Sequence, residues 1–328
     1  MKKRIIAAAL SAVMAVSLAA CGSTSGNAAS GGSGDGSYRI GVVQLVQHVA
    51  LDAATEGFQA ALTEKLGDKV SFDVQNASGD SATCATIANS FVSDGVDLIM
   101  ANATPSLQAA TAATDSIPVL GTSITDYATA LEIDNWNGTV GTNVSGTSDL
   151  APLDQQADCV KELFPDAGTI GILYCSAEAN SAYQATTMRG YLEELGYTVQ
   201  DYSFSDSNDL SGVCTTACGE VDVLYIPTDN TAANNTELIN NITTPAGIPV
   251  FCGEEGICKG CGVATLSISY YDLGYKTGEM AYEVLVNGKD ISTMAVEYAP
   301  SVTKEYIPDR ASALGITVPD DYEVIEAE

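Results

Sequence analysis

The sequence predicts an α/β protein made of two Rossmann-like, doubly wound parallel-sheet domains joined by a hinge. Short runs of apolar, often β-branched residues alternate with longer segments whose apolar residues recur at helical spacing, as in parallel sheets covered by helices. The alternation pauses at 135–149, a stretch rich in Asn, Gly, Thr and Ser that is typical of a crossing between domains, and then restarts. The roughly 290 residues from Tyr38 onward suffice for two domains of ordinary size.

The first half of the chain predicts four strands with helices between them. Strands are expected at 38–44, 70–75, 96–100 and 117–121, and helices at 51–66, at 80–93 and from Pro105 onward. The helix at 51–66 places Leu51, Phe58 and Leu62 on one face, which is the pattern of a helix that packs on a sheet. Pro105 suits the first turn of a helix, because no intrahelical hydrogen bond is lost there.

The second half repeats this alternation. Strands are expected at 169–175, 197–204, 221–226, 249–251 and 263–269, and helices at 150–164, 180–195, 209–219, 231–243 and 273–287, with a short helix within 311–319. Two similar halves predict a cleft between hinged domains. The first domain is expected at 38–147 plus about 270–293, and the second at 148–269 plus about 294–328.

The N-terminal residues predict a membrane anchor and a tether. Three basic residues, at positions 2–4, precede an apolar run at 5–20 that is too short for a comfortable membrane span. The run ends Leu-Ala-Ala-Cys21, the pattern of a bacterial lipobox, so 1–21 is interpreted as a lipoprotein signal peptide with Cys21 lipidated; an ordinary signal peptide is the alternative. Residues 22–37 are rich in Gly and Ser and predict a flexible tether. We therefore expect a lipid-anchored protein on the outer face of the bacterial cell membrane.

Charge and composition exclude several functions. The formal net charge is −29, and removal of the three basic signal residues takes it to −32, which argues against binding to nucleic acid or to anionic lipid. His48 is the only histidine, and no Gly-x-Ser-x-Gly elbow, phosphate-binding loop or dinucleotide fingerprint occurs. We therefore predict neither an enzyme nor a cofactor, with an α/β hydrolase as the enzymatic alternative.

The cysteines allow three interpretations. Eight follow Cys21, and they are Cys84, Cys159, Cys175, Cys214, Cys218, Cys252, Cys258 and Cys261. An even number outside the cytosol permits disulfides, whereas their scatter through apolar and helical patterns suits buried thiols. A zinc site would lack an evident fourth ligand and a nearby histidine, so no metal is predicted.

Polar residues follow most of the predicted strands, where ligands bind in open parallel sheets. They are Gln44, His48, Asn76, Asn102, Thr104, Pro105, Ser123, Thr125, Asp126, Ser176, Glu178, Asn180, Ser181, Thr228, Asp229, Asn230, Glu254 and Glu255. A carboxylate such as Asp229 suits an ammonium group, and helix starts at Pro105 and Ser181 suit a carboxylate. Any one of these residues could instead cap the next helix, so the repetition in both halves carries the ligand interpretation.

Several motifs occur in a characteristic order. They are Gln44-Leu-Val-Gln-His48, Asn76-Ala-Ser-Gly79-Asp80, Ala103-Thr104-Pro105-Ser106, Thr125-Asp126, Glu178-Ala-Asn180-Ser181, Pro227-Thr228-Asp229-Asn230 and Tyr270-Tyr271-Asp272-Leu273-Gly274. From Tyr38 to Pro319 the chain resembles ABC transporter substrate-binding lipoproteins of the tryptophan/tyrosine type, which have the type I periplasmic binding protein fold. Val49 and Tyr127 depart from the pattern, since the family usually has Pro at both places.

This resemblance implies a monomer that captures a small zwitterion, an aromatic or other hydrophobic amino acid, and delivers it to an ABC permease and its ATPase. The matching motifs imply ligand contacts at Thr104, Asn180, Ser181, Asp229 and Asn230, with Gln44, Pro105, Asp126 and Glu254 behind them. Tyrosines or Trp136 would close over the ligand's side chain. A ligand-sensing receptor lipoprotein and a binder of a nucleoside or sugar are the alternatives.

Overall fold

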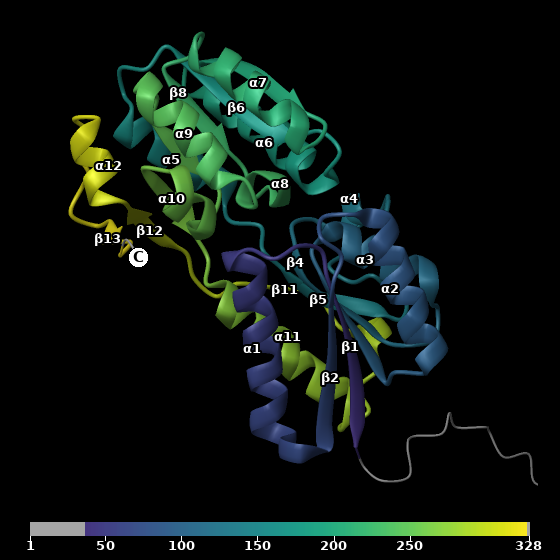
Figure 1. Cartoon of the computed structure of the whole chain (residues 1–328). Coiled ribbons are helices and arrows are strands. Elements are labelled where there is room, and N and C mark those ends of the chain that lie inside the picture. The colour runs from purple at the N-terminus through teal and green to yellow at the C-terminus, as the bar shows by residue number, and fades with distance from the viewer. Residues whose placement is uncertain (1–36, 327–328) are drawn as a thin grey trace, which may run out of the picture.

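The computed structural model describes residues 37–326, which form two α/β lobes connected by three chain crossings (Figure 1). The predicted signal peptide, the predicted lipidation site Cys21 and the tether up to residue 36 lie outside the described residues. Within 37–326, no helix combines the length and the apolar character that crossing a bilayer requires.

The first lobe is built on a six-stranded sheet in the order β11-β5-β4-β3-β1-β2, with every neighbouring pair parallel. The strands are β1 (Tyr38–Gln44), β2 (Val70–Asn76), β3 (Leu98–Asn102), β4 (Val119–Ile124), β5 (Val144–Ser148) and β11 (Glu297–Tyr298). The helices are α1 (Val49–Leu66), α2 (Ser81–Asp94), α3 (Thr104–Ala113), α4 (Tyr127–Ala130) and α11 (Tyr270–Leu285). Apolar side chains of α1 and α11, among them Phe58 and Met280, pack on one face of the sheet, and those of α2 and α3, among them Phe91 and Leu107, pack on the other.

The second lobe is built on a seven-stranded sheet in the order β13-β12-β10-β9-β8-β6-β7. The strands are β6 (Thr169–Cys175), β7 (Thr198–Phe204), β8 (Val223–Ile226), β9 (Val250–Cys252), β10 (Ala264–Ser267), β12 (Thr303–Tyr306) and β13 (Glu323–Val324). Only the β10–β12 pair is antiparallel. The helices are α5 (Leu153–Leu163), α6 (Ala179–Glu194), α7 (Ser207–Cys218), α8 (Asn230–Ala233), α9 (Thr236–Ala246), α10 (Glu255–Cys261) and α12 (Pro308–Ala313).

The predicted fold class is confirmed, and the errors concern individual elements. The stretch at 135–149 is not only a crossing, because it contains β5, a buried strand of the first sheet whose small polar residues hide it from a search for apolar runs. The helix expected at 231–243 is two helices, because Asn235 leaves the helical backbone conformation between them. Helices α4 and α10 and the strands β11, β12 and β13 were not predicted.

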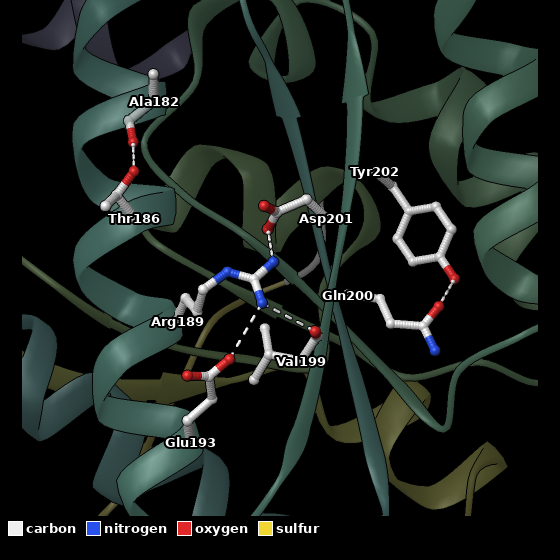
Figure 2. A network of polar contacts seen from close by, with 8 residues as sticks. All are labelled: Ala182, Thr186, Arg189, Glu193, Val199, Gln200, Asp201 and Tyr202. Atoms are coloured by element: carbon white, nitrogen blue, oxygen red, sulfur yellow. Dashed lines mark hydrogen bonds and ion pairs between the residues drawn. The ribbon is translucent and has the colours of Figure 1, made fainter.

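Helix α6 is fixed to the second sheet by Arg189. Figure 2 shows its guanidinium between the helix and β7, where Nη2 lies 2.6 Å from Asp201 Oδ1. Its Nη1 donates to Glu193 Oε1 at 3.1 Å and to the carbonyl of Val199 at 3.0 Å. These bonds hold the helix whose first turn carries Asn180.

The C-terminal end of helix α10 is held by Arg310 of α12. The two terminal nitrogens of this guanidinium donate to the carbonyls of Cys258, Lys259, Gly260 and Gly262, at distances from 2.8 to 3.0 Å. One side chain thus satisfies carbonyl groups that the C-terminal end of a helix leaves without partners. The segment near the chain's end thereby positions the helix that begins beside Glu254.

Helices α1 and α11 lie in direct backbone contact in the first lobe (Figure 1). A Cβ added at Gly57 of α1 would collide with the carbonyl of Tyr271, and a Cβ added at Gly274 of α11 would collide with the carbonyl of Ala54. Glycine is therefore required at both positions for the observed approach. The chain passes from β10 of the second sheet into α11 of the first lobe. The contact with α1 therefore fixes this returning segment to the first lobe.

Candidate ligand-binding site

A small cavity lies between the two lobes, beyond the carboxyl ends of strands from both sheets. Such crevices are where open α/β sheets bind ligands. The cavity is lined by His48, Ala50, Leu51, Ser123, Thr125, Asp149, Asn180, Thr228, Asp229, Asn230, Ala233, Glu254 and Tyr270. Its remaining space is about 10 Å³, close to the volume that one water occupies by this measure, so the lobes meet closely around it.

Three buried carboxylates face this cavity, and they are its dominant feature. Asp149 is 3% exposed, Asp229 is 1% exposed and Glu254 is 2% exposed. Among the described residues that line the cavity there is no Lys and no Arg. Because burial of an ionised carboxylate without a counter-charge is unfavourable, the site is suited to a positively charged group.

Asp149 is held by hydroxyl groups. Thr125 Oγ1 donates to its Oδ1 and the Tyr270 hydroxyl to its Oδ2, both at 3.0 Å. Burial raises the pKa of Asp149 to about 6, and these two hydrogen bonds oppose the rise. Asp149 follows β5, and the failure to predict that strand is why sequence reasoning missed it. Because the strand Val144–Ser148 is itself composed mostly of small and polar residues, its end gave no contrast by which Asp149 could be recognised.

Asp229 and Glu254 both cap short helices. The N–H groups of Cys175 and Ala232 donate to the two oxygens of Asp229, at 2.6 and 2.8 Å. The N–H groups of Gly256 and Ile257 donate to the two oxygens of Glu254, each at 2.6 Å. Burial, with the charge of Glu178 second, raises the pKa of Asp229 to about 7, and burial raises the pKa of Glu254 to about 7.

Other polar atoms at the cavity have no partner among the described residues. They are His48 Nδ1, Ser123 Oγ and Asn180 Oδ1, all buried. His48 does bridge the lobes, since its Nε2 lies 3.3 Å from Asn230 Oδ1. Burial lowers the pKa of His48, so the ring is neutral at physiological pH and does not supply the missing positive charge.

The predicted site residues divide into two groups. Asn180, Asp229, Asn230 and Glu254 line the cavity, whereas the other five lie outside it. Gln44, Thr104, Pro105, Asp126 and Ser181 form the second group. Thr104 begins α3 with Pro105 as the next residue, and Pro105 lines a neighbouring cavity of about 230 Å³.

Gln44, Asp126 and Ser181 make hydrogen bonds within the protein. Gln44 Nε2 donates to the carboxylate of Asp52 at 2.6 Å and to the carbonyl of Val46 at 3.0 Å. Asp126 Oδ1 caps α4 by accepting the N–H of Thr129. Ser181 Oγ lies 3.3 Å from Asn180 Nδ2. Trp136, expected to close over a ligand, stacks on Tyr127 and does not line the cavity, whereas Tyr270 does.

The cysteines of the described region are free thiols. All eight after Cys21 are unpaired, and seven of them are buried. Within residues 37–326 no group of three or more His, Cys, Asp or Glu side chains is arranged to hold a metal ion. The cavity's chemistry is therefore that of carboxylates, hydroxyls, amides and helix ends.

This fold, with a polar cavity between two parallel-sheet lobes, defines a type I periplasmic binding protein. Residues 39–327 match the family described as ABC transporter substrate binding protein, and the chain belongs to this family. It is the extracytoplasmic substrate-binding protein of an ABC transporter, and it binds a small molecule. Such proteins are binders and not enzymes, as the sequence predicted.

The similar proteins include an amino-acid binder and a structure with an amino acid. The tyrosine-binding protein of Clostridioides difficile (strain R20291) is 37% identical over 302 residues, which cover 90% of this chain and 87% of that protein. An ABC domain from Streptococcus pneumoniae in complex with L-Trp is 32% identical with a TM-score of 0.84, covering 88% of this chain and 100% of that one. The ligand-free, open structure of a substrate binding protein with adhesive properties from Clostridium difficile is 37% identical with a TM-score of 0.68, covering 89% and 100%.

Proposed function

We propose that this protein binds an aromatic amino acid, L-tyrosine or L-tryptophan, in the cavity between its lobes and delivers it to the permease of its transporter. The observation that carries the proposal is the group of three buried carboxylates, Asp149, Asp229 and Glu254, around a cavity whose lining has no basic side chain. The ammonium group of an amino acid supplies the counter-charge through charge-assisted hydrogen bonds. Two relatives, a tyrosine-binding protein and a domain in complex with L-Trp, agree with this chemistry.

The lobes are proposed to stand in their closed arrangement here. The TM-score is 0.84 with the L-Trp complex but 0.68 with the ligand-free, open structure, although the second of these has the higher sequence identity. The first cavity alone has room for about one water, so in this arrangement a ligand would have to occupy it together with the adjoining cavity of about 190 Å³, and the lobes must separate for the ligand to enter. Closure around a bound ligand then gives the permease a form of the protein to recognise.

A second cavity is the proposed place for the ligand's side chain. It has a volume of about 190 Å³ and shares Ala50, Glu254 and Tyr270 with the first cavity. Ile268 and the ring of Tyr271 also line it and supply apolar surface. The carboxylate of Glu305 lies in the same wall and suits a phenol hydroxyl or an indole N–H as a hydrogen-bond acceptor.

A thermal-shift screen of the mature protein against the amino acids, with nucleosides and sugars as controls, tests this function. A ligand that binds only the folded state stabilises it, and a hundredfold excess over Kd is worth about 2.7 kcal/mol, or roughly 5–10 °C in Tm. We expect L-tyrosine or L-tryptophan to give the largest shift. Shifts with a nucleoside or sugar and with no amino acid would overturn the proposal.

We also propose that Cys21 carries the lipid anchor and that the mature protein is a monomer. The basic start, the apolar run and the Leu-Ala-Ala-Cys21 sequence support the anchor. The wild type is expected to partition into the detergent phase of Triton X-114 and the Cys21→Ala variant into the aqueous phase, with Cys84→Ala as the control.

Light scattering should give the mass of a single chain; a dimer mass at micromolar concentration would contradict the monomer.

A further inference from the structure

We propose that the first turn of helix α1, together with the hydroxyl of Ser123, is the subsite that binds the ligand's α-carboxylate. This inference rests on the proposed amino-acid binding and adds to it a specific orientation. The three carboxylates of the cavity explain the recognition of an ammonium group, but they would repel the carboxylate of the same ligand. The cavity therefore needs a region of positive potential as well.

Helix α1 supplies that region. It has 18 residues and begins at the cavity, where Ala50 and Leu51 of its first turn form part of the lining. The first N–H groups of a helix have no intrahelical acceptor, and the side chain of the N-cap residue His48 makes no capping hydrogen bond. These N–H groups and the positive end of the helix dipole favour an anion.

The other helices that begin at this cavity are occupied by acceptors of their own. Asp229 caps α8, Glu254 caps α10 and the hydroxyl of Ser269 caps α11. Helix α6 follows Glu178, whose carboxylate oxygen lies 3.3 Å from Asn180 Nδ2 and would repel an anion there. Among the described helices that begin at the cavity, only α1 therefore has both free N–H groups and no carboxylate lining the cavity at its start. Asp52 of its first turn accepts a hydrogen bond from Gln44 Nε2 and does not line the cavity.

Ser123 provides an independent observation. Its side chain is only 5% exposed, its Oγ has no partner among the described residues, and it lines the same cavity. Ser123 also has φ of 56°, a left-handed conformation that L-residues other than Asn and Asp seldom adopt. A strained residue with an unpaired buried hydroxyl is costly unless a ligand uses that hydroxyl.

The two ends of the ligand are thereby assigned to different walls. The carboxylate contacts the N–H groups of Ala50 and Leu51 and the Ser123 hydroxyl, all from the first lobe. The ammonium group contacts Asp149 of the first lobe and both Asp229 and Glu254 of the second, so it joins the lobes. This arrangement accepts amino acids and rejects amines that lack the carboxylate.

Calorimetry with two ligand pairs, L-tyrosine with tyramine and L-tryptophan with tryptamine, measures the contribution of the carboxylate. The wild type should bind each amine at least tenfold more weakly than its amino acid, because hydrogen bonds to a charged group are lost. Ser123→Ala should weaken amino-acid binding about tenfold and amine binding less than twofold. Ser106→Ala, which also removes a buried hydroxyl of the first lobe but lies outside the cavity, is the matched control.

A proline pair tests the helix end itself. Ala50→Pro and Val49→Pro each remove one first-turn N–H, where proline is tolerated, but only Ala50 lines this cavity. Ala50→Pro should reduce the preference for amino acid over amine. Val49 lines the cavity proposed for the ligand's side chain, so Val49→Pro should change the two affinities alike and leave that preference unchanged. Thermal unfolding confirms that each variant is folded.

The outcomes separate this inference from the proposed function. If tyramine or tryptamine binds as tightly as its amino acid, the carboxylate subsite is refuted while ammonium recognition stands. Equal losses for acid and amine in Ser123→Ala would refute it too. If neither amino acids nor amines bind, the proposed function fails and the subsite fails with it.

Discussion

Two kinds of helix start face the same cavity. Helices α8 and α10 begin with Asp229 and Glu254, whose oxygens are occupied by N–H groups of the protein, so these helix ends present negative charge. Helix α1 begins with His48, which makes no cap, and its first N–H groups stay available. The same secondary structure thus offers an acceptor in the second lobe and a donor in the first, depending on one residue.

This difference shows how a binding protein can recognise a zwitterion without lysine or arginine at its site. In the proposed site the N–H groups of an uncapped helix take the place of a cationic side chain, and the carboxylates that cap two other helices supply the negative charge. The caps are held by hydrogen bonds before ligand arrives, so little ordering of these side chains is needed on binding.

Replacement of Asp229 by Asn should have the largest effect. The amide keeps one oxygen, which can still accept the capping N–H of Ala232, but it loses the acceptor of the Cys175 N–H and the charge that attracts the ammonium group. Binding of the best amino acid should therefore weaken by on the order of 2 kcal/mol, about 30-fold in Kd by calorimetry. Asp80→Asn is the matched control, because Asp80 caps α2 in the same way and does not line the cavity. Unchanged affinity in Asp229→Asn would remove this residue from the ammonium site.

Acidification should weaken binding by roughly tenfold between pH 8 and pH 5. The pKa values of Asp149, Asp229 and Glu254 are raised to about 6, 7 and 7, so these groups hold protons at pH 5 that an ammonium ligand must displace. Affinity therefore rises as pH rises through this window, and protons are released on binding. Calorimetry in two buffers of different ionisation enthalpy measures that release, and its absence near pH 6.5 would contradict the assignment.

The stability of the ligand-free protein should have the opposite pH dependence. A carboxylate whose pKa is raised by folding binds more protons in the folded state than in the unfolded state between pH 4 and 7. These groups therefore stabilise the fold less as pH rises through that window. Glu305, whose pKa burial also raises to about 7, contributes in the same direction. Chemical denaturation of the wild type and Glu254→Gln at pH 5 and pH 7.5 should show a smaller pH effect in the variant.

Removal of the Tyr270 hydroxyl should have a smaller effect. Tyr270→Phe deletes one of two hydroxyl donors to Asp149, and a hydrogen bond to a charged group contributes about 1.5–3 kcal/mol. Part of that loss raises the pKa of Asp149 further, and part is recovered by Thr125, so we expect a Kd three- to tenfold higher at pH 7.5. The deficit should shrink at pH 9; a constant deficit would point to lost packing instead.

Reductant should have no effect on ligand binding. Cys258 and Cys261 lie in α10 behind Glu254, and every cysteine in 37–326 is a free thiol. Alkylation of the denatured, unreduced protein should label all eight of these thiols by intact mass. Binding with and without dithiothreitol should be equal, and a mass that shifts on reduction would show a disulfide.

Much of the fold could be predicted because apolar runs determine buried parallel strands. β1 and β6 lie where their sequences indicated. Each is a seven-residue segment rich in apolar residues, several of them β-branched, and this is the pattern of a buried parallel strand. β5 could not be found in this way, because its burial comes from neighbours on both sides and its own residues are small and polar. The two-residue strands are determined by pairing partners elsewhere in the chain and leave no local pattern.

The candidate site was predictable where a polar residue lies within about five positions after a strand. Asn180, Asp229, Asn230 and Glu254 follow strands of the second sheet and line the cavity. Gln44 ends β1 but turns to Asp52 and Thr55 of its own lobe, a choice of hydrogen-bond partner that strand position cannot reveal. Ala50 and Leu51 also line the cavity, and their proposed role could not be predicted because a backbone N–H group carries no side-chain signature.

The glycine contacts between α1 and α11 have a mechanical consequence. Because the two backbones are in direct contact there, the helices cannot slide past one another without collision, and we expect them to move as one rigid unit. Both begin at the cavity, so the first turn of α1 and Tyr270 must travel together when the lobes part. We therefore expect bending at the short crossings at 149–152, 268–269 and 299–302, and this half of the proposed binding site should keep its geometry as the lobes separate.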